Sequence, residues 1–440
     1  MSGRRGIAAA FLGAILVAAC GQPESFPPVR PVSMNLTDAS TGFGIALTDR
    51  LLAEPNASNV FISPLSATLA LSMAAAAAHG ATRASIMATL GLDPSVDPSS
   101  QAKLTIDRLL QSDDNAQLEL AQAMWAQKGL ALNSTYVARL RDDYRAQIAS
   151  LDFTSPYAPK VVNDWVDKAT HHKIQQLVDT FDPGTVAYLV NATYFHALWA
   201  TEFHTSHDPL NFHTFSGTSV NVPMMTREHR IIRMGTHDYQ AVLLPYKGGR
   251  FSMVILLPSK VLSPTEFSRF LTQATWSQAL TMFHSAVGPV FGGSSCTNQE
   301  PSPNIGLDCD GELVMPKFKV DYRAELLPEL VAMGMAVGDL PDICGGCFIS
   351  GVVQKTHLEV DEKGTTASAA TGVGVVLSAR AATVIDHPFA LALIDNATDA
   401  PLFLGVIGTS ESATIARGLR KTCEIRRSQA RVLAKRAEWR

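Results

Sequence analysis

The first half of the chain carries apolar residues mainly at helical spacing. Residues 59–92 open with a short apolar run, turn at Ser63-Pro64, and continue as an Ala-, Leu- and Met-rich helix that ends near His79-Gly80, with a second helix behind it. Similar patterns predict three further helices, at residues 99–111, 134–148 and 158–177. Residues 118–127 alternate apolar and polar positions, which predicts a half-buried strand.

The second half is dominated by strand patterns. Residues 186–200 form one long apolar run, and residues 239–259 form two apolar runs around Tyr246-Lys247-Gly248-Gly249, which predicts a hairpin. Residues 312–335 predict a strand and then a helix, and residues 387–410 predict a hairpin that turns at residues 396–399. Helices followed by long strands indicate one large α+β domain with mixed or antiparallel sheets.

Residues 361–381, DEKGTTASAATGVGVVLSARA, fit neither a core element nor a linker. The run has too little bulk to nucleate a core, too few charges for a solvated linker and no proline for a stiff spacer. Strand spacing would divide its small residues between two faces, and all of them can be buried in a sheet without stranding a charge. The composition predicts a segment that is a loop in one state and a buried strand in another.

Composition and charge add two expectations. Apolar residues make up 46% of the 440 residues and charged residues 17%, which predicts a large folded core. The formal net charge is −4, but residues 417–440 hold nine Lys or Arg against two Glu. The net charge of residues 1–416 is therefore near −11. This basic tail is a solvated helical extension or a contact for acidic partners or anionic lipid.

The first twenty residues have the pattern of an export signal: two arginines, a short apolar run, and small residues that end in Cys20. The sequence LVAAC resembles a bacterial lipobox, which implies lipidation of Cys20; the alternative is an ordinary signal peptide with an incidental cysteine. If the host is Gram-negative, the lack of an aspartate directly after Cys20 favours outer-membrane sorting. We therefore expect an exported protein, either an outer-membrane or cell-surface lipoprotein or a periplasmic or extracellular one.

The remaining cysteines allow two readings. Disulfides persist in exported proteins, and the economical pairing joins Cys296 to Cys309 and Cys344 to Cys347. The alternative is a four-cysteine zinc site, because CGGC has the inner spacing of zinc ligands, although the gap between Cys296 and Cys309 fits zinc poorly. Cys423 is left over.

Enzymatic activity has little support in the sequence. Neither G-x-S-x-G nor H-E-x-x-H occurs, and GVGVV lacks the third glycine of a dinucleotide site. His204, His207 and His213 lie in a polar connecting segment and are interpreted as surface histidines, and His171-His172 fall on a predicted helix where neighbours cannot share a face. We expect no catalytic residues, no metal and no cofactor.

Eight separate motifs resemble the serpins, the family of serine-protease inhibitors. They occur in the family's order over about residues 40 to 410 and are NVFISPLSATLALSM, LVNATYFHALWATEF, VPMM, LLPYKGGRFSMVILLP, LVMPKFKV, EVDEKGTTASAAT, HPFALALI and PLFLGVIGTS. The resemblance implies the serpin fold, with a cluster of helices and an exposed reactive loop at residues 362–385. It also implies a suicide substrate: a protease cleaves the loop, is acylated, and is trapped when the loop inserts into the central sheet.

The resemblance also assigns site residues. The hinge of the loop would comprise Glu362, Lys363, Gly364, Thr365, Thr366, Ala367, Ser368, Ala369, Ala370 and Thr371. Counting from Glu362 as the family does places the cleaved bond at Ser378-Ala379. Leu377-Ser378 suits a chymotrypsin-like or subtilisin-like protease better, and Arg380-Ala381 suits a trypsin-like one, so three bonds remain open.

Residues under and above the opening sheet match as well. Ser63, Pro64, Ser66 and Asn191 fall in the family's shutter motifs and Trp199 in its breach motif. Gln354 stands where the family commonly has a histidine, so inhibition requires that Gln354 satisfies the same hydrogen-bond partners.

The expected organisation follows from these boundaries. Residues 1–20 are the signal, 21–38 a Pro-rich tether, 39–410 the serpin domain with an insertion at 285–312, and 411–440 a basic extension. The expected partner of the monomeric protein is a serine or cysteine protease, with the membrane reached through Cys20 and no nucleic acid. The alternatives are a non-inhibitory serpin-fold binding protein and a structural surface lipoprotein.

Overall fold

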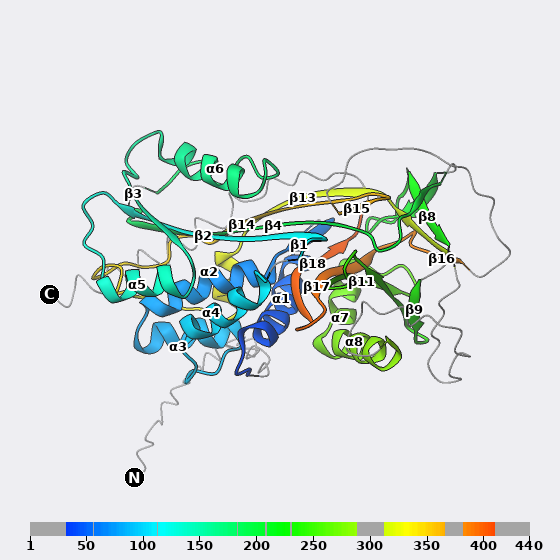
Figure 1. The fold of residues 1–440 in the computed structure, drawn as a ribbon, viewed down its shortest axis with the longest axis horizontal. Coiled ribbons are helices and arrows are strands. Elements are labelled where there is room, and N and C mark those ends of the chain that lie inside the picture. Colours follow the sequence, from blue (N-terminus) through cyan, green and yellow to red (C-terminus); the bar gives the residue numbers. More distant parts are fainter. Residues whose placement is uncertain are drawn as a thin grey trace, which may run out of the picture.

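The computed structural model describes residues 32–55, 57–111, 113–182, 184–206, 209–228, 231–287, 312–365 and 382–409. Within them the chain folds into helices and three sheets plus a small hairpin (Figure 1). The helices are α1 (Leu36–Leu52), α2 (Pro64–Ala77), α3 (Gly80–Leu90), α4 (Pro98–Leu109), α5 (Ser134–Asp142), α6 (Ala158–Ala169), α7 (Pro264–Phe270), α8 (Gln273–Val287) and α9 (Leu327–Ala332).

Sheet 1 is six-stranded and contains Gly364 and Thr365 of the predicted hinge. Its strands in spatial order are β13 (Phe318–Glu325), β14 (Val353–Val360), β15 (Gly364–Thr365), β4 (Ala187–Leu198), β2 (Ala116–Gln127) and β3 (Gln147–Leu151). Neighbours are antiparallel except β2 and β3.

Sheet 2 and sheet 3 complete the architecture. Sheet 2 is antiparallel, in the order β1 (Asn59–Ile62), β18 (Ala400–Ile407), β17 (Phe389–Asp395), β11 (Phe251–Pro258), β10 (Tyr239–Pro245) and β9 (Ile232–Gly235). Sheet 3 has the order β16 (Ala382–Val384), β12 (Glu312–Pro316), β8 (Met224–Glu228) and β5 (His204–Thr205), and the small hairpin joins β6 (Leu210–His213) to β7 (Ser219–Val222).

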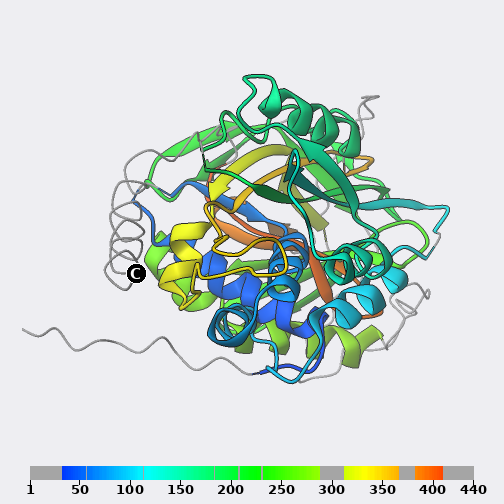
Figure 2. The same ribbon diagram turned by 90° about the vertical axis from the view of Figure 1, so that its left-hand side faces the viewer.

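The main core lies between sheet 1 and sheet 2. Strands β11, β17 and β18 are buried at every position, as their nearly continuous apolar sequences require. Helix α2 contacts both β4 and β18, and it is apolar almost all round because protein surrounds it on every side. Figures 1 and 2 place α1 and α2 on one side of sheet 1 and α6 on the other.

The sequence correctly predicts the α+β class, both hairpins and the entry into α2. Ser63 caps α2 by accepting a hydrogen bond from the Ser66 N–H at 3.3 Å, and Pro64 occupies the first helical position, where no N–H is needed. The first hairpin turns at Gly248 and Gly249, which adopt φ of 83° and 71°. The second turns between β17 and β18.

Two predicted helices are too long. The helix predicted at 134–148 ends with α5 at Asp142, because Arg145 takes φ 52° and the chain then forms β3. The helix predicted at 158–177 ends with α6 at Ala169, since His171 and His172 take φ of 49° and 64°. The two histidines therefore lie in a turn, where they contact Glu119 and Asp167.

Three other expectations need correction. The segment 312–335 contains two strands rather than one, because the chain passes from β12 in sheet 3 to β13 in sheet 1 at Pro316-Lys317. His204 and His213 lie on strands β5 and β6 rather than in a connecting segment, and His207 is outside the described residues. Helix α1 begins within the predicted tether, and α8 and β12 take up the ends of the predicted insertion.

In the described part of the chain, no helix combines the length and apolarity needed to span a membrane.

Candidate functional site

The candidate site is the place where the two-residue strand β15 enters sheet 1. Thr365 pairs with Val360 of β14 on one side and with Ala197 of β4 on the other. Among the described strands, β4 and β14 form no ladder with each other and are joined only through β15. Beyond Thr365, the sheet therefore has a gap between two facing edges.

Glycine is the only residue type that fits position 364, at the start of β15. A Cβ built on Gly364 would lie 2.2 Å from the carbonyl oxygen of Ala197 and 2.9 Å from the Cα of Leu198. Both are backbone atoms of a paired strand, which cannot move aside as a flexible side chain could. Glycine thus allows the hinge to approach β4 closely.

Thr365 is 1% exposed and is fixed through both its side chain and its backbone. Its hydroxyl lies 2.6 Å from the hydroxyl of Tyr246, and its carbonyl oxygen lies 3.0 Å from Nδ1 of His196. Burial raises the pKa of Tyr246 well above its ordinary value, so the phenol is neutral and can donate or accept. A short neutral side chain is required at position 365, because a charge there would be buried without a partner.

The turn before β15 is held by Asp361 and Trp199. Oδ1 of Asp361 accepts hydrogen bonds from the N–H groups of Lys363 and Gly364 at 2.9 and 3.1 Å. Nε1 of Trp199 donates to the Asp361 carbonyl at 2.9 Å, and the Trp199 N–H donates to Lys363 O at 2.8 Å. Trp199 is also stacked on Tyr246, with ring centroids 4.5 Å apart. The predicted breach residue therefore contacts the hinge directly.

Glu362 anchors the hinge to sheet 3. Its carboxylate pairs with the ammonium group of Lys317 and accepts a hydrogen bond from the hydroxyl of Thr205. Burial by itself would raise the pKa of Glu362, but the bonds from Lys317 and Thr205 outweigh it and the pKa is lowered. At neutral pH this carboxylate is ionised and bonded both to β5 and to the link between β12 and β13.

The predicted shutter residues lie together beneath the gap. Gln354 makes two hydrogen bonds to the backbone of Ser63: Oε1 accepts from the Ser63 N–H at 3.1 Å and Nε2 donates to the Ser63 carbonyl at 2.9 Å. The Ser63 hydroxyl donates to Leu402 O at 2.6 Å, and the Ser66 hydroxyl donates to Asn191 O at 3.4 Å. Gln354 thus satisfies buried partners on α2 although it is not a histidine.

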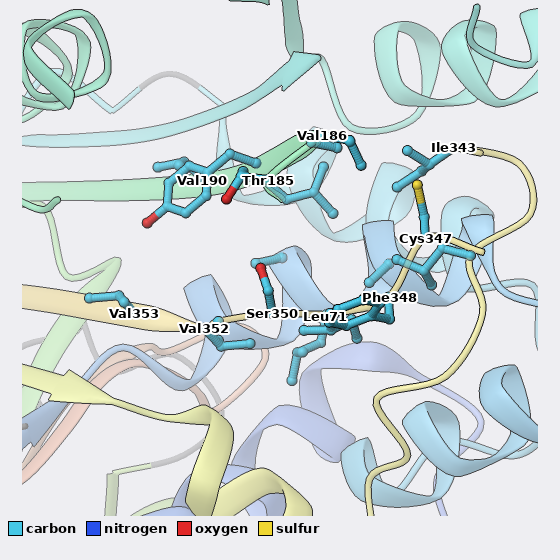
Figure 3. Close-up of a pocket in the computed structure, with 18 of the residues that line it drawn as sticks. Leu71, Thr185, Val186, Val190, Ile343, Cys347, Phe348, Ser350, Val352 and Val353 are labelled. Carbon is cyan, nitrogen blue, oxygen red and sulfur yellow. The ribbon is translucent and has the colours of Figure 1, made fainter. Parts of the chain in front are cut away.

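A cavity of about 560 Å³ continues the gap below the shutter residues (Figure 3). Its walls are the first half of β4, the segment 343–353 and helix α2. Figure 3 labels Val186 and Val190 on the side of β4, and Phe348 and Val352 on the opposite side. The cavity is mainly apolar, as the slot for a strand of small residues would be.

The structure places the predicted cysteines only in part. Cys344 and Cys347 form a disulfide next to the cavity, as predicted for that pair, so these two cysteines are not free to act as zinc ligands. No cluster of metal-binding side chains occurs among the described residues. Other predicted site residues lie outside the described ranges: Cys20, Cys296, Cys309, Thr366, Ala367, Ser368, Ala369, Ala370, Thr371, Leu377, Ser378, Ala379 and Arg380.

The sequence interpretation missed five residues of the hinge site: Lys317, Thr205, Tyr246, Asp361 and His196. The sequence could have indicated Lys317, because a lysine directly after a buried apolar strand needs a carboxylate or water as its partner. Tyr246 and Thr205 carried no comparable signal, since only the packing of separate elements brings their hydroxyls to the hinge.

We expect Gly364→Ala to release β15 from sheet 1, because the added Cβ would collide with the backbone of β4. Overpacking of this kind typically costs ~1–3 kcal/mol, which corresponds to about 5- to 150-fold more local opening. Hydrogen exchange at the amides of Asp361 and Trp199, both bonded to the hinge backbone, would report it. Gly345→Ala is the matched control, because a Cβ there meets nothing within 4 Å. Equal exchange in the two variants would contradict the close approach.

We expect Glu362→Gln to weaken the acid sensitivity of the protein. The pKa of Glu362 is lowered from its ordinary value of 4.5, so its stabilising contribution is complete above that pH and is lost as the pH falls through the folded-state value. Urea denaturation between about pH 6 and pH 3 should therefore show a smaller loss of unfolding free energy in Glu362→Gln than in the unchanged protein. Glu202→Gln, at an exposed carboxylate, should behave like the unchanged protein. An equal loss of unfolding free energy with falling pH in all three proteins would exclude the Glu362–Lys317 ion pair as a stabilising contact.

Comparisons with known proteins agree with this geometry. The family model described as "Serpin (serine protease inhibitor)" matches residues 38–408. Iripin-8 from Ixodes ricinus is 30% identical over 428 residues, which cover 90% of this chain and 98% of the relative. Alpha-1-antiproteinase from Rattus norvegicus is 27% identical over 416 residues, which cover 88% of this chain and 91% of the relative.

Solved structures share the fold. Thyroxine-binding globulin in complex with thyroxine superimposes with a TM-score of 0.74 at 22% identity, covering 85% of this chain and 99% of that one. The native state of tengpin, a thermophilic serpin, gives a TM-score of 0.70 at 24% identity, covering 87% of this chain and 97% of the tengpin chain. The chain belongs to the serpin family, whose members are generally protease inhibitors rather than enzymes.

Proposed function

We propose that this protein inhibits a serine-type endopeptidase as a suicide substrate. The protease would cleave within the segment that follows Thr365, form an acyl-enzyme, and be trapped when that segment inserts between β4 and β14. The single observation that carries the proposal is the position of Thr365, which is paired with Val360 and Ala197 at the upper end of a gap in sheet 1.

The register of β15 supports a continued strand. If the pairings of Thr365 with Val360 and Ala197 continue along the gap, Ala369 comes to lie between Thr356 and Thr193, and Thr371 lies between Gln354 and Asn191. These positions share the inward face with Thr365, because side chains alternate along a strand. Small neutral residues at 367, 369 and 371 would fit there without steric or charge penalty.

The energetic gain of insertion comes from the two facing edges. Each inserted residue provides ladder partners for backbone groups of β4 or β14 and buries the apolar walls of the cavity. This gain offsets the distortion of the protease that remains attached to the inserted loop. A loop that inserted slowly would instead be cleaved and released, so the rate of insertion decides between inhibitor and substrate.

The candidates for the cleaved bond remain Leu377-Ser378, Ser378-Ala379 and Arg380-Ala381. We favour Leu377-Ser378, because leucine fills the specificity pocket of a chymotrypsin-like or subtilisin-like protease better than serine does. The partner is then a protease of one of these classes, and the inhibitor needs no cofactor.

The location and domain boundaries are also proposed. Residues 1–20 would direct export, Cys20 would carry a lipid anchor, and residues 21–35 would link the anchor to α1 at Leu36. The anchored protein would act at the outer membrane or cell surface and meet extracellular or periplasmic proteases there. Residues 411–440 would remain a basic extension of the inhibitory domain.

The alternative is a non-inhibitory member of the family that binds a ligand or serves as a surface protein. The fold alone does not discriminate, since thyroxine-binding globulin has it as well. The hinge composition favours inhibition, because bulky, charged or proline residues would block insertion and residues 365–371 include none.

The test is incubation of the protein with subtilisin, chymotrypsin, elastase and trypsin, followed by denaturing gels. We expect an adduct at the combined mass that survives boiling, and the first residue of the released C-terminal fragment should identify the cleaved bond. Thr365→Arg should abolish the adduct and turn the protein into a substrate, because it would bury a charge at a site that is 1% exposed.

Thr365→Val is the matched control, since it keeps the size of the side chain and loses only the bond to Tyr246. It should still form the adduct. Cleavage without an adduct by every protease tried would refute the inhibitory proposal and favour the binding alternative.

A further inference from the structure

The disulfide between Cys344 and Cys347 closes a tight turn beside the cavity. The N–H of Leu340 donates to Cys347 O at 2.9 Å, and the N–H of Gly346 donates to Oδ1 of Asp339 at 3.0 Å. Asp339 and Phe348 form an isolated antiparallel bridge across the turn. The cysteine bond and these backbone bonds together hold the chain in a reversed rather than an extended conformation.

The two sulfurs differ in accessibility. Cys347 is 6% exposed, whereas Cys344 is only half-buried and is followed by the exposed residues Gly345 and Gly346. Attack on a disulfide requires access to one sulfur, and a C-x-x-C arrangement favours thiolate formation on release. Cys344 is therefore the sulfur that an external thiolate can reach.

This turn immediately precedes the part of the gap where β14 is missing. Strand β4 begins at Ala187, but β14 begins only at Val353. If the pairings of β15 continue, the residue opposite Ala187 is Val375, and its partner on the other side is Ser350. Residues 350–352 are not in a strand, so the lower end of the gap has only one edge ready to pair.

We propose that Cys344–Cys347 is a thiol–disulfide exchange site, and that its reduction frees residues 343–352 to extend β14 along the gap. An extended β14 would supply the missing edge and accelerate insertion of the cleaved loop. The regulatory part of this inference rests on the proposed inhibitory function, whereas the exchange chemistry does not.

The reaction requires a dithiol reductant. A thiolate of the dithiol attacks Sγ of Cys344, the bond to Cys347 breaks, and Cys347 leaves as a thiolate that takes up a proton. The second thiol of the reductant, as a thiolate, then attacks its own sulfur in the mixed disulfide and releases Cys344, which is protonated in turn. The dithiol becomes a disulfide, and the protein gains two electrons and two protons.

The chemical arm of the test treats the native protein with dithiothreitol, followed by alkylation and mass mapping of the peptide that contains both cysteines. We expect both to be alkylated while the circular dichroism spectrum of the folded protein is unchanged. The released turn should also be cut faster by thermolysin between residues 340 and 352. Alkylation of this peptide only after the protein unfolds would overturn the exchange site, whatever the other cysteines do.

The functional arm measures how many inhibitor molecules are consumed per trapped protease. Closure of so short a loop restricts the chain by an amount equivalent to roughly a tenfold change in an equilibrium. If the whole of this restriction opposes insertion, reduction raises the rate of insertion by the same factor, about tenfold. The number of inhibitor molecules consumed per trapped protease should then fall. An unchanged or higher ratio would overturn the regulatory part.

The double variant Cys344→Ser, Cys347→Ser separates this disulfide from the other cysteines. It should behave like the reduced protein and show no further response to dithiothreitol. Gly345→Ala, which keeps the disulfide and adds no clash, should respond as the unchanged protein does. If the oxidised protein traps no protease at all, the inhibitory function fails, and the mapping and thermolysin results still decide the exchange site.

Discussion

The pairing of Thr365 between β14 and β4 holds the two halves of sheet 1 together. It is the one place where the described strands connect the two halves of sheet 1. Below it, the edges of β4 and β14 form no ladder with each other among the described strands, and an open edge is a ready template for another strand. The hinge holds the sheet together in its present state and also marks where an incoming strand would start.

Polar contacts stabilise this arrangement at two levels. At the upper end, Glu362 fixes the hinge to Thr205 of sheet 3 and to Lys317 beside it, and Trp199 donates to the Asp361 carbonyl. At the middle, Gln354 holds α2 through both backbone groups of Ser63. Glutamine supplies one acceptor and one donor at its amide, so it bonds both the N–H and the C=O of one residue. Gln354 is thus the partner of the Ser63 N–H, and it shares the Ser63 C=O with the N–H of Ala67.

The sequence predicts those parts of the fold in which local and global preferences agree. The α+β class, the two hairpins and the turn into α2 at Ser63-Pro64 follow from apolar patterns and turn residues. The lengths of α5 and α6 do not, because Arg145, His171 and His172 adopt left-handed backbone conformations that their residue types disfavour and that tertiary contacts impose. In the candidate site, the small residues of the hinge are visible in the sequence, whereas Tyr246 and Thr205 reach the hinge only through packing between distant segments.

The most direct measurement compares the thermal unfolding of the intact protein with that of the protein cleaved once between residues 366 and 381 by a protease it does not trap. If the gap between β4 and β14 accepts the cleaved loop, the new strand completes sheet 1, and Tm should rise well above that of the intact protein. Amides of β4 and β14 that face the gap should at the same time become protected from hydrogen exchange. A Tm that stays the same or falls after cleavage, with no added protection, would contradict the central claim that this sheet is built to receive the loop.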